Sequence, residues 1–278
     1  MSDYVLKIDC PDEKGLVHRI SGILYHHGLN MMENDEFVDR DSSHFFMRAV
    51  FSGNLNIPRV RKEVEAILPE NANMVLISRK PKNIVVLATK EYHCLGDLLM
   101  RHHFGELNAH INAVISNHET LSDFTRRFDI PYHCIPTDGL KKEEHEAMLI
   151  EEIKKIKPDY IVLAKYMRIF TPFFTSKFPG RIINIHHSFL PAFVGARPYQ
   201  QAYERGVKMI GATAHFVNEN LDEGPIIRQD VSYVNHKFDG QGMSKAGKDV
   251  ERLVLSQALK VILDDRVFIH GNKTVVLE

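Results

Sequence analysis

Hydrophobic and polar positions in the first 80 residues change repeatedly between the period of a strand and the period of a helix. The elements that this pattern predicts are, in order, strand 4–10, helix 16–28, strands 30–40 and 45–51, helix 58–68 and strand 74–78. This order of elements is typical of a compact α/β module in which two helices pack on one sheet. We therefore predict a ferredoxin-like βαββαβ domain over residues 1–80.

After a polar linker at residues 79–83, short runs that are almost continuously apolar alternate with helical segments. The expected strands are 84–88, 109–116, 160–166 and 181–187, and the helices between them lie near 93–104, 119–128 and 142–156. Strands that are apolar on both sides belong to parallel sheets covered by helices on both faces. Residues 84–278 are therefore predicted to form a Rossmann-like α/β domain with a mostly parallel sheet. The polar stretch 235–249 is expected to be a loop before a final helix at 250–263.

The strand 181–187 ends in polar side chains, where a strand built only for packing would continue with apolar ones. It carries Asn184, His186 and His187, and a later turn places Asp222 two residues before a glycine. Taken singly, these residues are ordinary strand caps, core histidines and turn formers. Together they supply an amide donor, an imidazole and a carboxylate at the strand ends, where parallel sheets bind ligands. Such groups are suited to acyl chemistry.

The amino-acid composition limits which classes of binding partner are expected. The net charge is -1, which favours neither nucleic acid nor an anionic membrane, and no apolar run is long enough to span a bilayer. The N-terminus lacks the features of a signal peptide, and the three cysteines show no CxxC spacing. We expect a cytoplasmic protein without disulfides or a thiolate zinc site.

A metal-dependent hydrolase is the alternative that the polar residues leave open. Its ligands would be His186, His187, His215 and Asp222. The chain has no HExxH or comparable ligand spacing. The expectation is therefore that the site holds no metal.

Two segments of the second predicted domain resemble a known family. NIHHSFLPAF at 184–193, followed by GATAHFVNENLDEGPII at 211–227, is similar to the formyltransferase family that uses 10-formyltetrahydrofolate. The resemblance covers most of residues 84–230 and implies that Asn184, His186 and Asp222 are catalytic. Asn184 and His186 would stabilise the oxyanion and Asp222 would assist proton transfer.

The same resemblance implies further substrate-binding residues. YMRIF at 166–170 is similar to the family's pterin-recognition segment, which implies roles for Met167, Arg168 and Ile169. His187 stands where the transferases usually have proline, so it is assigned to substrate binding with its role left open. Large side chains follow the strand 84–88, where a ribosyl-phosphate acceptor would require close approach to the backbone. Water is the simplest remaining acceptor.

The N-terminal domain resembles an ACT module. CPDEKGLVHRISGILYHHGLNM at 10–31 carries the resemblance, which implies a regulatory amino-acid site at Gly15, Gly28 and Asn30 and a homo-oligomer. A purely structural dimerisation domain is the alternative. The identity of any effector, the sign of its effect and the number of subunits stay open.

An ACT module fused to a formyltransferase-like domain is the arrangement of the formyltetrahydrofolate deformylase family. The resemblance implies hydrolysis of 10-formyltetrahydrofolate to formate and tetrahydrofolate, which would supply formate for purine biosynthesis and balance one-carbon pools. The folate would be the substrate, and no tightly bound cofactor is expected. The alternatives are a formyltransferase to an unidentified amine and a non-catalytic folate-binding or amino-acid-binding regulator.

Overall fold

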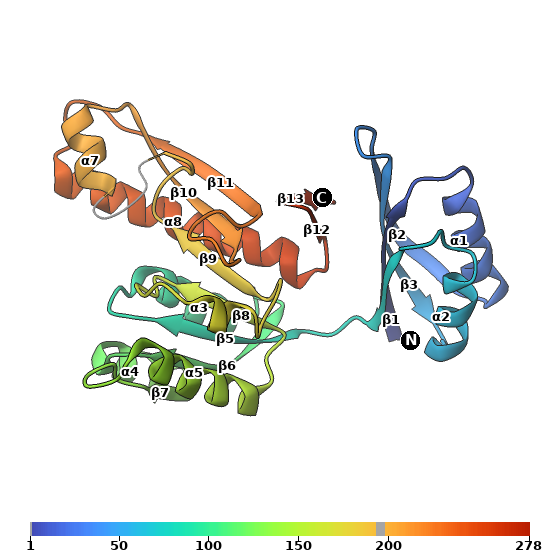
Figure 1. Ribbon diagram of the computed structural model, residues 1–278, viewed down its shortest axis with the longest axis horizontal. Helices are drawn as coiled ribbons and strands as arrows, with labels where there is room; N and C mark the ends of the chain where they lie inside the picture. Colours follow the sequence, from blue (N-terminus) through green and yellow to red (C-terminus); the bar gives the residue numbers. More distant parts are fainter. Residues whose placement is uncertain (1, 193–197) are drawn as a thin grey trace. The chain divides into compact units, whose positions relative to one another are not determined.

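The computed structural model describes residues 2–192 and 198–278, which fall into two compact units (Figure 1). The first unit comprises the chain up to Lys80, together with Asp264–His270 and Val275–Glu278. The second unit comprises Pro81–Leu263 and Gly271–Thr274. The last residues of the chain are thus divided between the units. Within the described ranges, no helix is both long enough and apolar enough to cross a membrane.

The first unit has the predicted βαββαβ order. Its elements are β1 (Ser2–Pro11), α1 (Leu16–His26), β2 (Asn30–Asp39), β3 (His44–Gly53), α2 (Ile57–Glu65) and β4 (Asn73–Ser78). The strands form an antiparallel sheet in the order β2-β3-β1-β4. This is the ferredoxin-like topology, so the predicted fold of the N-terminal region is confirmed.

Successive side chains of β3 point to opposite faces of the sheet of the first unit, and both faces are covered. Phe45 and Met47 belong to the core that α1 and α2 complete with Ile20 and Val60. Phe46 points to the other face. There it packs with Phe268 of β12 (Val267–His270), which pairs with β13 (Lys273–Val276). The C-terminal hairpin therefore takes part in the core of the first unit.

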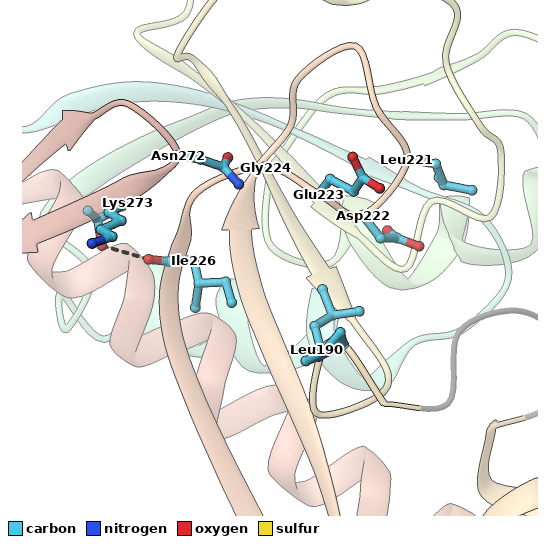
Figure 2. A pocket seen from close by; sticks show the side chains of 10 residues that line it. Leu190, Leu221, Asp222, Glu223, Gly224, Ile226, Asn272 and Lys273 are labelled. Atoms are coloured by element: carbon cyan, nitrogen blue, oxygen red, sulfur yellow. Dashed lines mark hydrogen bonds between the residues drawn. The ribbon is translucent and has the colours of Figure 1, made fainter.

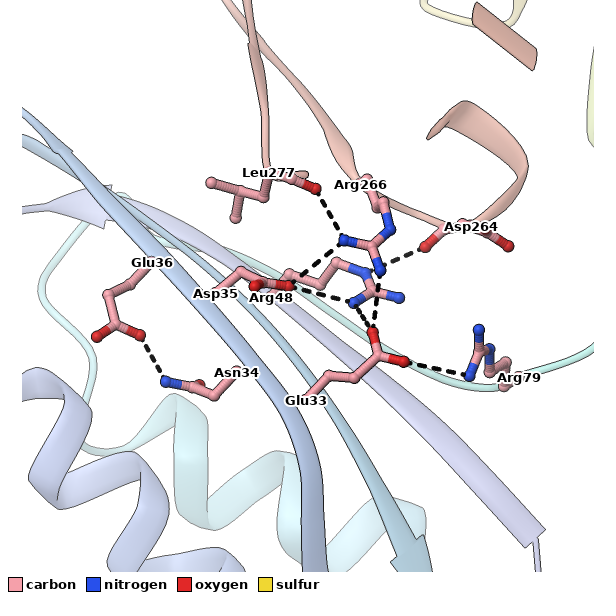
Figure 3. A network of polar contacts seen from close by, with 9 residues as sticks. All are labelled: Glu33, Asn34, Asp35, Glu36, Arg48, Arg79, Asp264, Arg266 and Leu277. Atoms are coloured by element: carbon pink, nitrogen blue, oxygen red, sulfur yellow. Dashed lines mark hydrogen bonds and ion pairs between the residues drawn. The ribbon is translucent and has the colours of Figure 1, made fainter. Parts of the chain in front are cut away.

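Arg48, fully buried on β3, is the centre of a polar network in the first unit (Figure 3). Its guanidinium donates to Glu33 Oε2 at 2.7 Å and to the carbonyl oxygen of Asp264 at 3.1 Å. The hydrogen bond from Arg48 holds the pKa of Glu33 below its usual range. Arg266 also pairs with Glu33, at 3.2 Å, and donates to the carbonyl oxygen of Leu277. The network joins β2 and β3 to the C-terminal segment.

The second unit is built around a seven-stranded sheet with the strand order β11-β10-β9-β8-β5-β6-β7. Its strands are β5 (Lys82–Ala88), β6 (Ala109–Ser116), β7 (Tyr132–Cys134), β8 (Tyr160–Ala164), β9 (Ile182–His186), β10 (Met209–Phe216) and β11 (Ile226–Tyr233). The neighbouring strands β9, β8, β5, β6 and β7 run parallel to one another, whereas β10 pairs antiparallel with both β9 and β11. The prediction of a mostly parallel sheet is confirmed.

Helices cover this sheet. They are α3 (His93–His103), α4 (Ser122–Arg126), α5 (Lys142–Ile156), α6 (Pro172–Thr175), α7 (Pro198–Arg205) and α8 (Gly240–Leu263), with a 3₁₀ turn at Glu119–Leu121. Val85 and Leu87 of β5 pack with Leu149 of α5 and Phe174 of α6 in one apolar core. The long helix α8 runs along β10 and β11 and contacts α3 and α7 (Figure 1). The apolar strands predicted from the sequence are therefore buried by helices, as parallel strands require.

The prediction of a loop at 235–249 is wrong for most of that stretch, because α8 begins at Gly240. Asp239 Oδ1 accepts a hydrogen bond from the backbone N–H of Gly242 at 2.7 Å and caps the first turn. Glycine at position 247 is needed for packing, since a Cβ there would lie 2.1 Å from Cζ of Tyr199. Glycines that lower helix propensity are thus tolerated here because tertiary contacts decide the conformation.

The Arg48 network predicts a measurable contribution to stability. We expect Arg48→Met to lower the free energy of unfolding by about 2 kcal/mol, because it removes a buried cation whose partner carboxylates remain. The control Arg59→Met breaks an exposed pair with Glu63 on α2 and should cost less than about 0.5 kcal/mol. Urea unfolding followed by circular dichroism measures both. Equal stability of the two variants would show that the network contributes nothing specific.

Candidate active site

The pairing of β9 with the antiparallel strand β10 sets the positions of the polar residues. Asn184 lies opposite His215, and His186 lies opposite Thr213. Both β9 residues are near the carboxyl end of a parallel strand, the edge at which such sheets bind ligands. The polar strand end identified in the sequence is therefore at the expected edge of the sheet.

Thr213 fixes the chain where it leaves β9. Its buried hydroxyl donates to the carbonyl oxygen of Ser188 at 2.9 Å and accepts from the backbone N–H of Leu190 at 3.0 Å. Gln229 of β11 donates to the same hydroxyl oxygen at 2.9 Å. The turn after His187, which contains the cis Leu190–Pro191 peptide bond, is thus tied to the two antiparallel strands.

Asp222 lies in the turn between β10 and β11 and has a left-handed backbone, with φ of 58°. Few residues other than glycine adopt this conformation, and aspartate is among the more tolerant of them. Gly224 lies so close to the end of β10 that a Cβ there would be 1.7 Å from the carbonyl oxygen of Phe216. The glycine of the Asp-Glu-Gly sequence lets the turn fold back onto β10, which brings Asp222 toward β9.

The side chains of the three predicted catalytic residues meet in one cluster. His186 Nδ1 lies 3.3 Å from Asp222 Oδ2, and Asn184 Nδ2 lies 3.2 Å from His215 Nε2. His215 Nδ1 donates to the carbonyl oxygen of Phe216 at 2.9 Å, and His215 Nε2 also lies 3.7 Å from Asp222 Oδ1. The Asn184 amide nitrogen carries two hydrogens, of which the contact with His215 takes one at most.

The contact with His186 influences the charge of the Asp222 carboxyl group. Burial raises the pKa of a carboxyl, but the hydrogen bond with His186 holds the pKa of Asp222 well below its usual range. His186 Nε2 is buried and has no hydrogen-bond partner among the described residues. It is therefore a ring nitrogen that can serve a bound ligand.

His187 stacks on His186, with ring centroids 4.9 Å apart and planes 20° apart. Burial and the positive charges of Lys165 and His186 lower the pKa of His187 to about 4. The two neighbouring rings therefore differ in role, with His187 neutral at physiological pH. This difference was not evident from the sequence.

The YMRIF segment follows β8, beside the end of β5. The backbone N–H of Met167 donates to Thr89 Oγ1 at 3.0 Å and anchors the segment to the end of β5. Met167 and Ile169 are more than half exposed, while Arg168 is half-buried. Two exposed apolar side chains beside the strand ends are consistent with a ligand-binding surface.

Figure 2 shows a pocket of about 650 Å³ along the Asp222 turn. Its lining residues are Leu190, Pro191, Leu221, Asp222, Glu223, Gly224, Ile226, Asn272, Lys273 and Thr274. Thr274 Oγ1 donates to the carbonyl oxygen of Ile226 at 2.6 Å and closes one side. None of the YMRIF residues lines this pocket, so it is separate from the surface that Met167 and Ile169 form.

The structure thus brings together Asn184, His186, His187 and Asp222. The predicted regulatory residues lie in the first unit, where Gly15 and Gly28 have φ of 88° and 67° at the two ends of α1 and Asn30 begins β2. Sequence reasoning missed a second buried polar cluster, made of His93, Lys165, Tyr199 and Glu251. Its members are far apart in the sequence and carry no local pattern.

One group of residues in the described part of the chain has metal-ligand geometry. His93, Cys94 and Glu251 place ligand atoms within 4.8 Å of one another. Burial raises the pKa of Cys94 well above its usual value, which disfavours the thiolate that a metal needs. Lys165 and Tyr199 already bind the Glu251 carboxylate. The group is therefore an ion-pair cluster rather than a metal centre.

Comparisons with protein families match both units. Residues 82–259 match the Formyl transferase family, and residues 4–69 match the ACT domain family.

Similar proteins match the whole chain. A formyltetrahydrofolate deformylase of Haemophilus influenzae is 52% identical over 273 residues, which is 98% of each chain. One of Escherichia coli is 53% identical with the same coverage. A formyltetrahydrofolate deformylase from Pseudomonas syringae superposes with a TM-score of 0.95 at 40% identity, covering 100% of this chain and 95% of that one. Glycinamide ribonucleotide transformylase 1 of Symbiobacterium toebii superposes with a TM-score of 0.69 at 28% identity, covering 76% and 100%.

The close approach of Gly224 to the carbonyl oxygen of Phe216 allows a steric test of the Asp222 turn. We expect Gly224→Ala to lower the free energy of unfolding by about 2 kcal/mol, because the methyl group meets rigid backbone. Gly96→Ala in α3 is the control, since its Cβ would make an ordinary 3.5 Å contact with Phe124. That change should be neutral or stabilise the helix by up to about 1 kcal/mol. Thermal unfolding measures both, and a fully stable Gly224→Ala variant would refute the close approach.

Proposed function

The chain belongs to the formyltetrahydrofolate deformylases, and from that premise we propose that it hydrolyses 10-formyltetrahydrofolate to formate and tetrahydrofolate. The observation that best supports this reaction is the buried contact between His186 and Asp222, next to Asn184. His186 Nε2 has no hydrogen-bond partner among the described residues, and the Asn184 amide has a hydrogen beyond its contact with His215. We propose that both groups donate to the oxygen of a formyl group that becomes an oxyanion.

Each catalytic residue has one role in this reaction. The oxygen of a water molecule bonds to the formyl carbon, and the proton lost by the water passes to Asp222. Asn184 and His186 stabilise the negative charge that develops on the formyl oxygen. When the C–N10 bond breaks, the electron pair stays on N10, which takes up the proton. Formic acid leaves and ionises to formate.

The residues after β5 support water as the acceptor. His93 and Cys94 at the start of α3 are buried, and His93 Nε2 lies 2.7 Å from Glu251 Oε2. Large buried side chains therefore follow β5 where a phosphate group would require close approach to the backbone. Transfer of the formyl group to an unidentified amine is the second candidate, and it is favoured only by the likeness to transformylases.

The folate enters this proposal as the substrate, with no resident cofactor. Met167, Arg168 and Ile169 are proposed to contact the pterin, because Met167 and Ile169 present apolar surface beside the strand ends. In the cell, the reaction would release formate for purine biosynthesis and balance one-carbon pools. A cytoplasmic location fits the free thiols of Cys10, Cys94 and Cys134.

The first unit is proposed to bind an amino-acid effector near Gly15, Gly28 and Asn30. The two left-handed glycines near the ends of α1 have open space where a side chain would stand, which a small ligand can approach. The edge strand β2 has a row of backbone groups that a second copy of the chain can pair with. A homo-oligomer is therefore part of the proposal.

The proposed reaction is tested by incubating purified protein with 10-formyltetrahydrofolate and no added acceptor. We expect one formate for each tetrahydrofolate, and we expect Asp222→Asn to reduce the rate at least about 100-fold because it removes the proton acceptor. Glu223→Gln, the adjacent carboxylate outside the His186 contact, should keep the rate within about threefold. Tight folate binding without turnover would favour the amine acceptor, and an active Asp222→Asn variant would refute the assigned role.

The proposed effector site predicts a change of rate with a free amino acid. We expect at least one of the common amino acids to change kcat or KM about fivefold or more, the usual size of an allosteric coupling. Gly28→Val, which strains a left-handed position, should weaken that response while the rate without effector stays near that of the wild type. Unchanged rates and no binding by calorimetry across the common amino acids would leave only a structural role for the module.

A further inference from the structure

His187 is the residue of the cluster that the mechanism above leaves without a task. Its ring is half-buried, stacks on His186 at 4.9 Å, and has no hydrogen-bond partner among the described residues. An imidazole with free nitrogens beside a reaction centre is suited to hold a ligand or a water molecule. Because hydrolysis needs a water that is aimed at the formyl carbon, the unused ring nitrogens have a chemical purpose in this reaction.

The stacking with His186 makes a proton on His187 unfavourable. Two imidazolium rings at this separation would repel each other. Burial and the charges of Lys165 and His186 lower the pKa of His187, while His186 Nδ1 contacts the Asp222 carboxylate. His187 is left neutral, and a neutral imidazole can accept a hydrogen bond from water at its unprotonated nitrogen.

The other side of His187 faces a buried ion-pair cluster. The ring of Tyr199 on α7 lies 6.4 Å from the ring of His187, and its hydroxyl donates to Glu251 Oε1. Glu251 Oε2 lies 2.7 Å from His93 Nε2 and 3.2 Å from Lys165 Nζ. Burial alone would raise the pKa of Glu251, but the hydrogen bond with His93 and the charge of Lys165 bring it down to about 2.

Two features indicate that this cluster is held in a specific geometry. Lys165 follows β8 with φ of 62°, a left-handed conformation that is unfavourable for lysine. The ring of Tyr199 packs against α8 so closely that only glycine fits at position 247. The cluster reaches His187 through the ring of Tyr199, whose centroid lies 6.4 Å from that of the His187 ring.

We propose that His187 binds the attacking water and that Lys165, Tyr199 and Glu251 are positioning residues that hold its ring in the required place. This inference rests on the proposed hydrolysis. The water would donate one hydrogen to His187, which aims an oxygen lone pair at the formyl carbon, while the proton that is lost passes to Asp222 as described above. His187 therefore orients the nucleophile without changing the balance of the reaction.

The charges around His187 favour this arrangement. Lys165 after β8 and His186 of β9 oppose protonation of the ring, while Glu251 of α8 and Asp222 of the β10–β11 turn favour it; Tyr199 of α7 is the remaining titratable neighbour. Burial adds to the effect of the cations, so the ring is neutral throughout the physiological range. Lys165 thus has two roles, because it neutralises Glu251 and disfavours a proton on His187.

The first test uses a substitution that preserves shape. His187→Phe keeps an aromatic ring to stack between His186 and Tyr199 but removes both nitrogens. We expect its single-turnover rate to fall at least about 100-fold, while the dissociation constant for tetrahydrofolate changes by less than about twofold. A rate near that of the wild type would overturn the role of His187. Equal losses of rate and of folate binding would also overturn it, because they would indicate packing alone.

The second test measures the protonation of His187 directly. In ¹⁵N-histidine-labelled protein, with the signal assigned by its loss in His187→Phe, the ring should be neutral at neutral pH. A protonated ring there would refute the proposal. Lys165→Met should raise the pH at which the ring and the acid limb of kcat titrate by about one unit. Lys248→Met, which removes a cation paired with Glu91 on the same helix as Glu251, should leave both unchanged.

Failure of this inference is distinguishable from failure of the proposed function. If the wild-type protein releases no formate without an added acceptor, the hydrolysis itself is wrong. If the wild type releases formate and His187→Phe does so equally fast, only the role of His187 is wrong. Should Lys165→Met fail to fold, the wild-type titration and the His187→Phe rate still decide the question.

Discussion

The register between β9 and β10 is the constraint on which the rest of the site depends. It places Asn184 opposite His215 and His186 opposite Thr213. A slip of one residue would turn every side chain of β9 to the other face of the sheet. Asp222 follows β10 in the turn that leads to β11, and its Oδ2 lies 3.3 Å from His186 Nδ1.

The adjacent residues His186 and His187 are assigned different functions because their surroundings differ. His186 contacts the Asp222 carboxylate, whereas burial and the charges of Lys165 and His186 lower the pKa of His187. Groups of one type whose environments separate their pKa values commonly serve as donor and acceptor in one reaction. The ion-pair cluster around Glu251 matters to catalysis in this account because it keeps that separation, while its contribution to stability is secondary.

The sequence was sufficient for the two folds, for four of the seven strands of the second sheet, and for Asn184, His186 and Asp222. Alternating and continuous apolar runs distinguish the two sheets, and Asn184, His186 and Asp222 were recognised because they lie within two short, similar segments. Lys165 and Glu251 were not recognised, because local periodicity carries no information on which distant residues pair. The start of α8 was misjudged because its glycines resemble a loop until the packing of Tyr199 against Gly247 is known.

We propose that this site directs water to the formyl carbon of the folate. Single-turnover hydrolysis in ¹⁸O-labelled water, followed by mass spectrometry of the formate, tests this role of water. One labelled oxygen is expected in every formate released, because one oxygen comes from the attacking water and the other from the formyl group. Formate without the label, or transfer of the formyl group to an amine in place of its release, would contradict it.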